Sequence, residues 1–346
     1  MILAAWALAK VAGALGFGLG LAGLLGWVER KQSAVLQDRI GANRADILGL
    51  RVIGLFHPIA DALKLMSKED FVPARALGVF HAAAPALSLG CGLLCLAALP
   101  FGGTVEALGR TWSLQPWASP AGLLYVMALL AVGVHGVVMA GYASGSNYGL
   151  LGGLRGAAQM VAYEVCTAAI LAGPMFLYGT LDLQQAVRWQ GRLLAGVLPA
   201  WGVFTQPLAF VLFLAAGMAA SKRIPFDLPE GESEIVGYHV AYSGMKFGMF
   251  MMADFIENIV VCGLGTTLFL GGWQIPFVAL TGPLGGALMV ASFSAKTCAL
   301  LFLLMQVRWT LPRLRFDQLL DLGWKSVLPL ALFNFLATVW GVYLWR

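Results

Sequence analysis

The stretch Ala220-Ser-Lys-Arg-Ile-Pro-Phe-Asp-Leu-Pro-Glu-Gly-Glu-Ser-Glu-Ile-Val-Gly-Tyr-His-Val-Ala-Tyr-Ser-Gly-Met-Lys246 separates two long apolar runs and concentrates acidic residues. Its carboxylates are Asp227, Glu230, Glu232 and Glu234. Pro225 and Pro229 prevent the start of the stretch from forming one plain helix. The sequence therefore predicts a folded loop over residues 220–242 at the membrane boundary, with carboxylates directed into protein or trapped water.

The composition around this loop is that of a protein that crosses a membrane several times. The 346 residues are 60% hydrophobic and 11% charged, and the mean hydropathy is +0.81. Soluble domains carry about 25% charged residues. The first apolar run lacks an Ala-x-Ala-like cleavage site, so we interpret it as a retained span. We expect a single integral membrane domain over residues 1–346, without nucleic-acid partners.

The apolar runs predict eight transmembrane helices, because a span needs ~20 apolar residues to cross ~30 Å of hydrocarbon. Only helices or closed barrels satisfy their backbone polar groups in lipid, so the fold class is all-α. The predicted spans are Ala5–Val28, Val79–Phe101, Ser119–Tyr142, Gly156–Tyr178, Pro199–Ala219, Ser243–Gly271, Pro283–Val307 and Ser326–Tyr343.

The basic residues predict the orientation of these spans. Most of the 22 Lys and Arg residues fall in loops on one side, which is expected to be cytoplasmic. Those on the other side are Arg110, Arg188, Arg192 and Arg346. Both termini are therefore expected on the periplasmic side of a bacterial cytoplasmic membrane. The loop over residues 29–75 and the acidic loop between the fifth and sixth spans are expected on the cytoplasmic side.

The first cytoplasmic loop contains an amphipathic pattern that begins at Pro58. Ile59, Leu63 and Met66 recur at helical spacing on one face. Proline is well suited to the first turn of a helix. We interpret this segment as a helix that lies in the membrane surface, with its charged face available to a partner.

Several ionisable residues fall inside the predicted spans. Glu164 lies in the fourth, Lys246, Asp254 and Glu257 in the sixth, and Lys296 in the seventh. Asp254 and Glu257 are three residues apart, so they lie partly on the same side of the helix. Ionisable residues within a membrane are costly and are taken as functional until shown otherwise. Together with the acidic loop, they suit proton transfer through enclosed water.

No redox centre is expected in the chain. The five cysteines fall in apolar runs without the spacing of a metal or iron–sulfur site. No Gly-x-Gly-x-x-Gly follows a predicted strand, so dinucleotide binding is not indicated. Any redox reaction must therefore use centres on other subunits, while this chain supplies a pocket and a coupling path.

Seven segments, in order along nearly the whole chain, resemble one family. They are Gln37-Asp-Arg-Ile-Gly-Ala-Asn-Arg44, Pro58-Ile-Ala-Asp-Ala-Leu-Lys64, Lys68-Glu-Asp70, Leu150-Leu-Gly-Gly-Leu-Arg-Gly-Ala-Ala-Gln-Met-Val-Ala-Tyr-Glu-Val165, Pro225-Phe-Asp-Leu-Pro-Glu-Gly-Glu-Ser-Glu234, Tyr242-Ser-Gly-Met-Lys-Phe247 and Thr310-Leu-Pro-Arg-Leu-Arg-Phe-Asp-Gln-Leu319. These look like the signatures of the H subunit of bacterial respiratory complex I, the homologue of mitochondrial subunit 1.

The resemblance implies a membrane subunit of a proton-translocating NADH:quinone oxidoreductase. Such a subunit forms the quinone access channel and chamber wall, with ubiquinone or menaquinone as substrate, and begins the proton path. NADH, FMN and iron–sulfur clusters are then bound by partner subunits. The implied partners are the peripheral-arm quinone-site subunits, an iron–sulfur subunit, neighbouring small membrane subunits and membrane lipid.

The resemblance also assigns roles to particular residues. The acids on the proton path or at the chamber would be Glu164, Asp227, Glu230, Glu232, Glu234 and Asp254. Glu257 is added to them because it lies inside the sixth predicted span. The residues that line or brace the quinone channel and the contact with the peripheral arm would be Arg30, Arg39, Arg44, Asp61, Lys64, Arg223 and Phe226. No metal ligand is implied.

This chain departs from the family pattern beside the acidic loop. Ala220 and Ala241 stand where glutamate is usual, and Lys222 stands where asparagine is usual. Asp254 occupies a position where glutamate is common. The loss of two acids leads us to expect compensation by Glu257 or Lys222.

Two other interpretations fit parts of the sequence. The first is the equivalent membrane subunit of an energy-converting hydrogenase, which uses no quinone; the segments at residues 39–44 and 310–319 favour complex I. The second is a free-standing secondary transporter, which would show inverted repeats with paired broken helices. The two halves of the chain carry no convincing repeat.

Overall fold

The computed structural model is a bundle of long helices. It describes residues 2–47, 49–107, 110–194, 196, 198–229, 231, 237–278 and 282–345. Seven helices within these ranges are long and apolar enough to cross a membrane. They are α1 (Ile2–Leu36), α3 (Gly78–Ala98), α4 (Gly122–Ala143), α5 (Asn147–Tyr178), α9 (Gly244–Phe269), α10 (Gly282–Thr310) and the segment formed by α11 (Phe316–Asp321), the π-helical η1 (Leu322–Val327) and α12 (Leu328–Trp345). The chain is therefore a mostly helical, multi-pass membrane protein.

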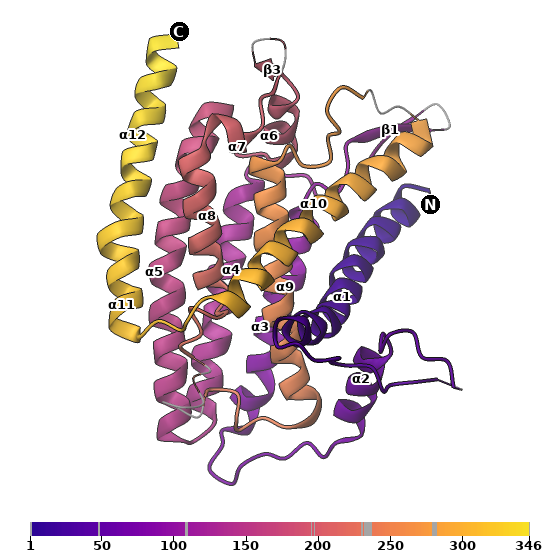
Figure 1. Cartoon of the computed structure of the whole chain (residues 1–346), viewed down its shortest axis with the longest axis vertical. Helices are drawn as coiled ribbons and strands as arrows, with labels where there is room; N and C mark the ends of the chain where they lie inside the picture. Colours follow the sequence, from indigo (N-terminus) through magenta and orange to yellow (C-terminus); the bar gives the residue numbers. More distant parts are fainter. Residues whose placement is uncertain are drawn as a thin grey trace.

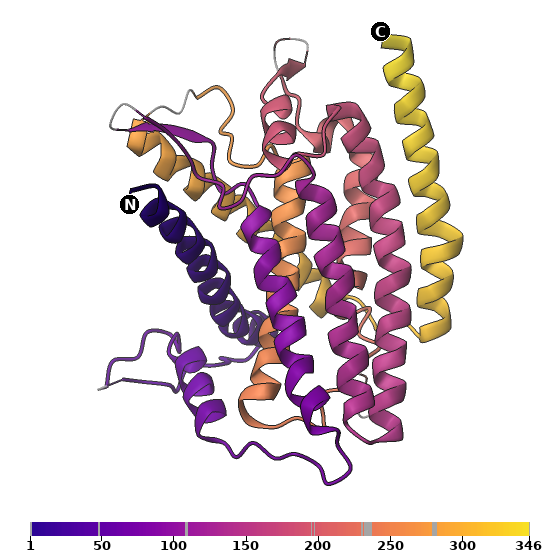
Figure 2. The same cartoon turned by 180° about the vertical axis from the view of Figure 1, so that it is seen from behind.

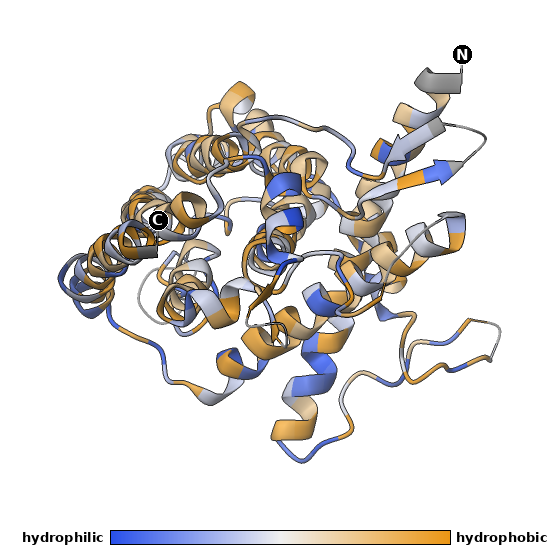
Figure 3. Ribbon diagram, turned by 90° about the horizontal axis from the view of Figure 1, so that it is seen from above, coloured by the Kyte–Doolittle hydropathy of each residue, from blue (hydrophilic) through white to orange (hydrophobic). Residues whose placement is uncertain are grey.

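Both chain termini point toward the same end of the bundle, called here the upper end (Figures 1 and 2). Two antiparallel hairpins also lie there, β1 (Thr104–Ala107) with β2 (Arg110–Ser113), and β3 (Leu193–Leu194) with β4 (Leu198–Pro199). The short helix α2 (His57–Ser67) and the connections that precede α5 and α9 lie at the opposite, lower end. Seen from above, the long helices carry mainly hydrophobic residues (Figure 3).

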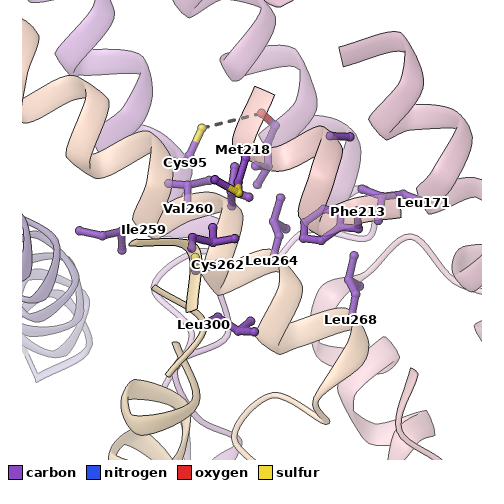
Figure 4. Packing of buried hydrophobic residues seen from close by; sticks show 14 of the residues in the cluster. Cys95, Leu171, Phe213, Met218, Ile259, Val260, Cys262, Leu264, Leu268 and Leu300 are labelled. Carbon is purple, nitrogen blue, oxygen red and sulfur yellow. Dashed lines mark hydrogen bonds between the residues drawn. The ribbon is translucent and has the colours of Figure 1, made fainter. Parts of the chain in front are cut away.

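Helix α9 forms the centre of the bundle. It contacts α1, α2, α3 and α10, and also the shorter helices α6 (Leu183–Gln190), α7 (Gly202–Thr205) and α8 (Pro207–Ala220). Ile259, Val260, Cys262, Leu264 and Leu268 of α9 pack with apolar side chains of the surrounding helices (Figure 4). Interiors of this kind are packed as densely as organic crystals, which holds side chains in fixed positions. Charged groups on α9 are therefore carried by a helix that is supported on all sides.

The fifth predicted span, Pro199–Ala219, is divided in the structure between α7 and α8. Gln206, between them, has φ −140° and ψ 57° because the ring of Pro207 disfavours a helical conformation in the preceding residue. Helix α8 has 14 residues, or about 21 Å at 1.5 Å per residue. The prediction of one continuous helix over this segment was therefore wrong.

A glycine allows α8 to approach α9 closely. Gly217 faces Val261, and a Cβ atom at position 217 would lie only 2.5 Å from the Val261 Cγ1 atom. Small residues at helix interfaces permit this close approach in membrane proteins. The contact fixes the end of α8, and with it the start of the acidic loop, against the middle of α9.

The C-terminal end of α9 is bound by a lysine from α10. The Lys296 Nζ atom donates hydrogen bonds to the backbone oxygens of Leu270, Gly272 and Gln274, at 2.8, 3.0 and 2.6 Å. It also lies 4.5 Å from the ring centroid of Trp201. The ammonium group thereby satisfies the carbonyl of the C-cap residue Leu270 and two carbonyls of the connection that follows α9. Lys296 has a structural role at the upper end of the bundle.

Helix α2 occupies the position of the predicted amphipathic segment and has a proline in its first turn. Ile59, Leu63 and Met66 are all exposed, and no residue of this helix is buried. Asp61 forms an ion pair with Arg30 of α1, with 2.6 Å between the Arg30 Nη2 and Asp61 Oδ2 atoms. The helix is thus attached to α1 and presents an exposed apolar face.

Candidate functional site

A buried ion cluster joins the start of the acidic loop to α9. The Lys222 Nζ atom lies 2.7 Å from Asp254 Oδ1 and 3.4 Å from Glu257 Oε2. The three residues are only 3%, 9% and 5% exposed. The backbone of Lys222 is left-handed, with φ 56°, a conformation that non-glycine residues seldom adopt and that occurs at helix ends and functional sites. The cluster therefore places three ionisable groups together in the interior of the bundle.

The lysine of this cluster remains charged. Burial alone would lower the pKa of Lys222, but the negative charges of Asp254 and Glu257 outweigh that effect and raise the pKa well above its ordinary value. A buried ammonium between two carboxylates compensates one of the two negative charges. The cluster is therefore suited to exchange a proton with its surroundings.

A small cavity extends the cluster toward α5. It has a volume of about 30 Å³ and is lined by Glu257, Glu164, Thr167 and Ser221, among mainly apolar residues. A cavity needs roughly 10–15 Å³ to hold one water molecule. The space between Glu164 and Glu257 thus has room for water between two carboxyl groups that come from different helices.

A second small cavity lies on the other side of the α8–α9 contact. It has a volume of about 20 Å³, and its lining includes Glu29, Arg223, Arg308 and Asn258. The Ser221 hydroxyl, which lines the first cavity, donates a hydrogen bond of 3.0 Å to Asn258 Oδ1. The two cavities are therefore connected through one polar side-chain contact.

Three charges from distant parts of the chain meet at the second cavity. Glu29 near the end of α1 forms ion pairs with Arg308 of α10 and with Arg223 of the acidic loop, where the Arg223 Nη1 to Glu29 Oε1 distance is 3.2 Å. The Arg223 guanidinium also stacks over Phe255 at 4.3 Å from the ring centroid. Glu29 and Arg308 were not predicted as site residues. Their signal in the sequence was a charge at the lower end of an apolar span.

The start of the acidic loop is held by Gln159 of α5. The Gln159 Nε2 atom donates to the backbone oxygen of Ala219 at 2.7 Å and to that of Phe226 at 2.5 Å. Gln159 is completely buried. Phe226 is also buried and lies 6.1 Å from Tyr163, measured between ring centroids. One amide therefore connects α5, the end of α8 and the loop.

Replacing Gln159 by leucine should weaken this attachment. Two buried carbonyls would lose their donor, at a cost of about 1–3 kcal/mol for each unsatisfied group. We expect a lower temperature of half-inactivation of the assembled complex. Gln184→Leu is the matched control, because that glutamine is also buried, on α6, and its amide has no hydrogen-bond partner among the described residues. Equal effects of both substitutions would contradict the proposed attachment.

The remaining candidate residues in the described part of the chain differ in their exposure to solvent. Arg39 is exposed and donates from Nε to Gln37 Oε1 at 2.7 Å. Arg44 and Lys64 are exposed, and Asp227 is half-buried. The candidates Glu230, Glu232 and Glu234 lie outside the described residues. The structure thus brings together Lys222, Asp254 and Glu257 with Glu164 across the cavity, and Arg223 with Glu29, but not the whole predicted set.

No candidate metal site occurs in the described part of the chain. Within those residues, no group of three or more His, Cys, Asp and Glu side chains could hold a metal ion. Cys91, Cys95, Cys166 and Cys262 are buried, whereas Cys298 is exposed.

The fold and the site define a multi-pass membrane protein with ionisable groups buried inside its bundle. A family described as NADH dehydrogenase matches residues 9–339. An H subunit of NADH-quinone oxidoreductase from Geobacter metallireducens is 43% identical over 334 residues, which cover 96% of this chain and 95% of that protein. The H subunit from Thermomicrobium roseum is 43% identical over 332 residues, covering 94% and 93%. The chain therefore belongs to the family of NADH-quinone oxidoreductase H subunits, the membrane subunits of complex I.

Proposed function

We propose that this chain forms the quinone access channel and part of the quinone chamber wall of complex I, and couples quinone reduction to proton translocation. The observation that carries this proposal is the buried cluster of Lys222, Asp254 and Glu257 at the start of the acidic loop. A sensor of events in a quinone chamber must lie close to the loop, and a proton path must lead into the bundle. The cluster meets both requirements.

The quinone side of the proposal involves the lower end of the bundle. The isoprenoid tail would enter past α1 and the apolar face of α2, where Ile59, Leu63 and Met66 are exposed. Residues proposed to line or brace the channel and the peripheral-arm contact are Arg30, Arg39, Arg44, Asp61, Lys64, Arg223 and Phe226. Partner subunits that bind NADH, FMN and iron–sulfur clusters would supply the electrons.

The coupling step is electrostatic. Reduction of the quinone and its uptake of protons change the charge in the chamber, and the loop carboxylates respond by a change in protonation or position. Asp227, Glu230, Glu232 and Glu234 are the proposed responding groups. Arg223, within the same loop, joins this region to Glu29, and Lys222 joins it to α9. A movement of the loop would therefore reach both charge clusters.

The path inward would begin at the Lys222 cluster. From Glu257 a proton could reach Glu164 through water in the cavity between them, because proton transfer needs a continuous set of donors and acceptors. Ser221 and Asn258 would connect this route to the cavity at Glu29. In this arrangement, Glu257 and Lys222 take the place of the acids that Ala220 and Ala241 do not supply.

We place the chain in the bacterial cytoplasmic membrane as a single domain over residues 1–346, with both termini periplasmic. The two termini point to the same end of the bundle (Figure 1), and basic residues are more frequent in the loops of the other end. The peripheral arm with its quinone-site and iron–sulfur subunits would then bind at the lower end. Small membrane subunits and lipid would contact the helices.

A direct test of the proposed function is quinone-dependent NADH oxidation by the purified assembly in liposomes, measured together with proton uptake. Quinone-site inhibitors should block both. Electron transfer to protons with release of hydrogen, without any need for quinone, would instead assign the chain to an energy-converting hydrogenase. Quinone reduction without inhibitor sensitivity would remove the chamber from the mechanism.

Glu232→Gln should lower the quinone reductase activity severalfold while the complex still assembles, because the loop would lose one of its responding charges. The measurement is the inhibitor-sensitive turnover in membranes, normalised to the amount of assembled complex. Glu106→Gln, an exposed carboxylate in β1 at the upper end, is the matched control and should have no effect. Full activity and full pumping in Glu232→Gln would exclude this residue from the mechanism.

A further inference from the structure

A large groove opens at the upper end of the bundle, far from the charged clusters. It lies between α12 and the segment of α7 and α8, with a volume of about 870 Å³. In Figure 1 the upper part of α12, which ends at the C-terminus, extends beyond the upper end of α5. Phe204, Leu208, Ala337, Gly341 and Val342 form part of its apolar lining. Small-molecule sites typically measure about 300–1,000 Å³ and are mainly apolar.

The floor of this groove is a buried polar network. The Gln206 Nε2 atom donates to Thr338 Oγ1 at 2.8 Å, and the Asn334 Nδ2 atom donates to Gln206 Oε1 at 2.8 Å. The three side chains are 7–9% exposed, and all three line the groove. Internal partners satisfy the amides and hold α12 to the break between α7 and α8. The groove above the network therefore has a fixed shape.

A positive charge lies next to one of the residues that line the groove. Trp189 of α6 lines the groove, and the Arg192 guanidinium carbon lies 5.7 Å from the centroid of the Trp189 ring. Arg192 is exposed and forms no ion pair with any described residue. Tryptophan and arginine are common where a protein meets lipid headgroups. An apolar groove thus ends beside a cation at the expected membrane surface.

From this arrangement we propose that the groove binds one anionic phospholipid, with its acyl chains along α12 and its phosphate group near Arg192. The apolar lining matches the chains, and the guanidinium can bind a phosphate with two hydrogen bonds. The site is separate from the proposed quinone chamber and does not depend on that function.

The proposal can be tested on the intact complex in lipid nanodiscs. The probe is deuterated phosphatidylglycerol, and mass spectrometry counts the molecules that remain bound to each complex after a detergent wash. Gly341→Trp should remove one bound molecule, because a Cβ atom at position 341 meets nothing within 4 Å and the larger side chain would fill the groove. Leu336→Trp, on the exposed face of the same helix, is the matched control and should retain it.

The proposed contact between the phosphate group and Arg192 is tested by comparing two arginine substitutions. Arg192→Gln should weaken phosphatidylglycerol binding at least fivefold, whereas Arg188→Gln, which lies on α6 and lines a different cavity, should not. Zwitterionic phosphatidylcholine should not replace the probe in the wild-type complex. Retention of the probe in Gly341→Trp, equal binding of phosphatidylcholine, or density for a protein helix in the groove of the assembled complex would each overturn the proposal.

Discussion

Replacing Lys222 by methionine should reduce quinone-dependent proton pumping at least tenfold and destabilise the assembled complex. The substitution leaves Asp254 and Glu257 without their shared counter-charge in a site that is more than nine-tenths buried. Removing one partner of a buried ion pair typically costs about 3–5 kcal/mol. Pumping is measured as acidification of liposomes during NADH oxidation, and stability as the temperature of half-inactivation.

The charge of Lys222 and the conformation of its backbone can be tested separately. Methionine has a side chain of similar length and, like lysine, is unfavourable at φ 56°, so this comparison isolates the charge. The double variant Lys222→Met with Asp254→Asn removes one of the two unpaired carboxylates and should restore most of the stability. If Lys222→Met pumps and survives heating like the wild type, the ammonium group is not the counter-charge of the site.

Glu257→Gln should abolish most of the proton pumping while NADH oxidation falls less than threefold. This residue reaches both Lys222 and the cavity that leads to Glu164, so its loss interrupts the proposed path without touching the quinone chamber. The amide is similar in shape but cannot take up a proton. We therefore expect fewer protons to be translocated for each NADH oxidised.

The control for this substitution is Thr267→Val on the same helix. Thr267 is completely buried and donates to the backbone oxygen of Gly263 at 2.7 Å. Its replacement removes a buried polar group but no ionisable one, so the pumping ratio should be unchanged. An unchanged ratio in Glu257→Gln would show that this carboxylate does not compensate for the missing acids at positions 220 and 241.

The helical fold could be predicted from the sequence because each span is a local property. About 20 apolar residues suffice to indicate a helix in a membrane, whatever the rest of the chain does. The break at Gln206 also had a local cause, the following Pro207, which a search for apolar runs alone overlooks. Helix ends and breaks depend on single residues, whereas span prediction averages over many.

The site could be predicted only in part, because its contacts join distant positions. Asp254 and Glu257 could be assigned to one side of a helix from their spacing alone. Their contact with Lys222 depends on how closely α8 approaches α9 at Gly217, which no local pattern reports. The ion pair between Glu29 and Arg308 joins the first long helix to α10 and was likewise hidden from sequence reasoning.

The attachment of Lys296 to the backbone directly after α9 bears on how this helix can move. Sliding of α9 along its axis would break the three hydrogen bonds of this ammonium group, so the contact opposes such a movement. We therefore expect Asp254 and Glu257 to keep their positions on α9. If the proposed coupling holds, we expect a change at the lower end to move the segment around Lys222 relative to these two carboxylates, rather than to move the carboxylates themselves.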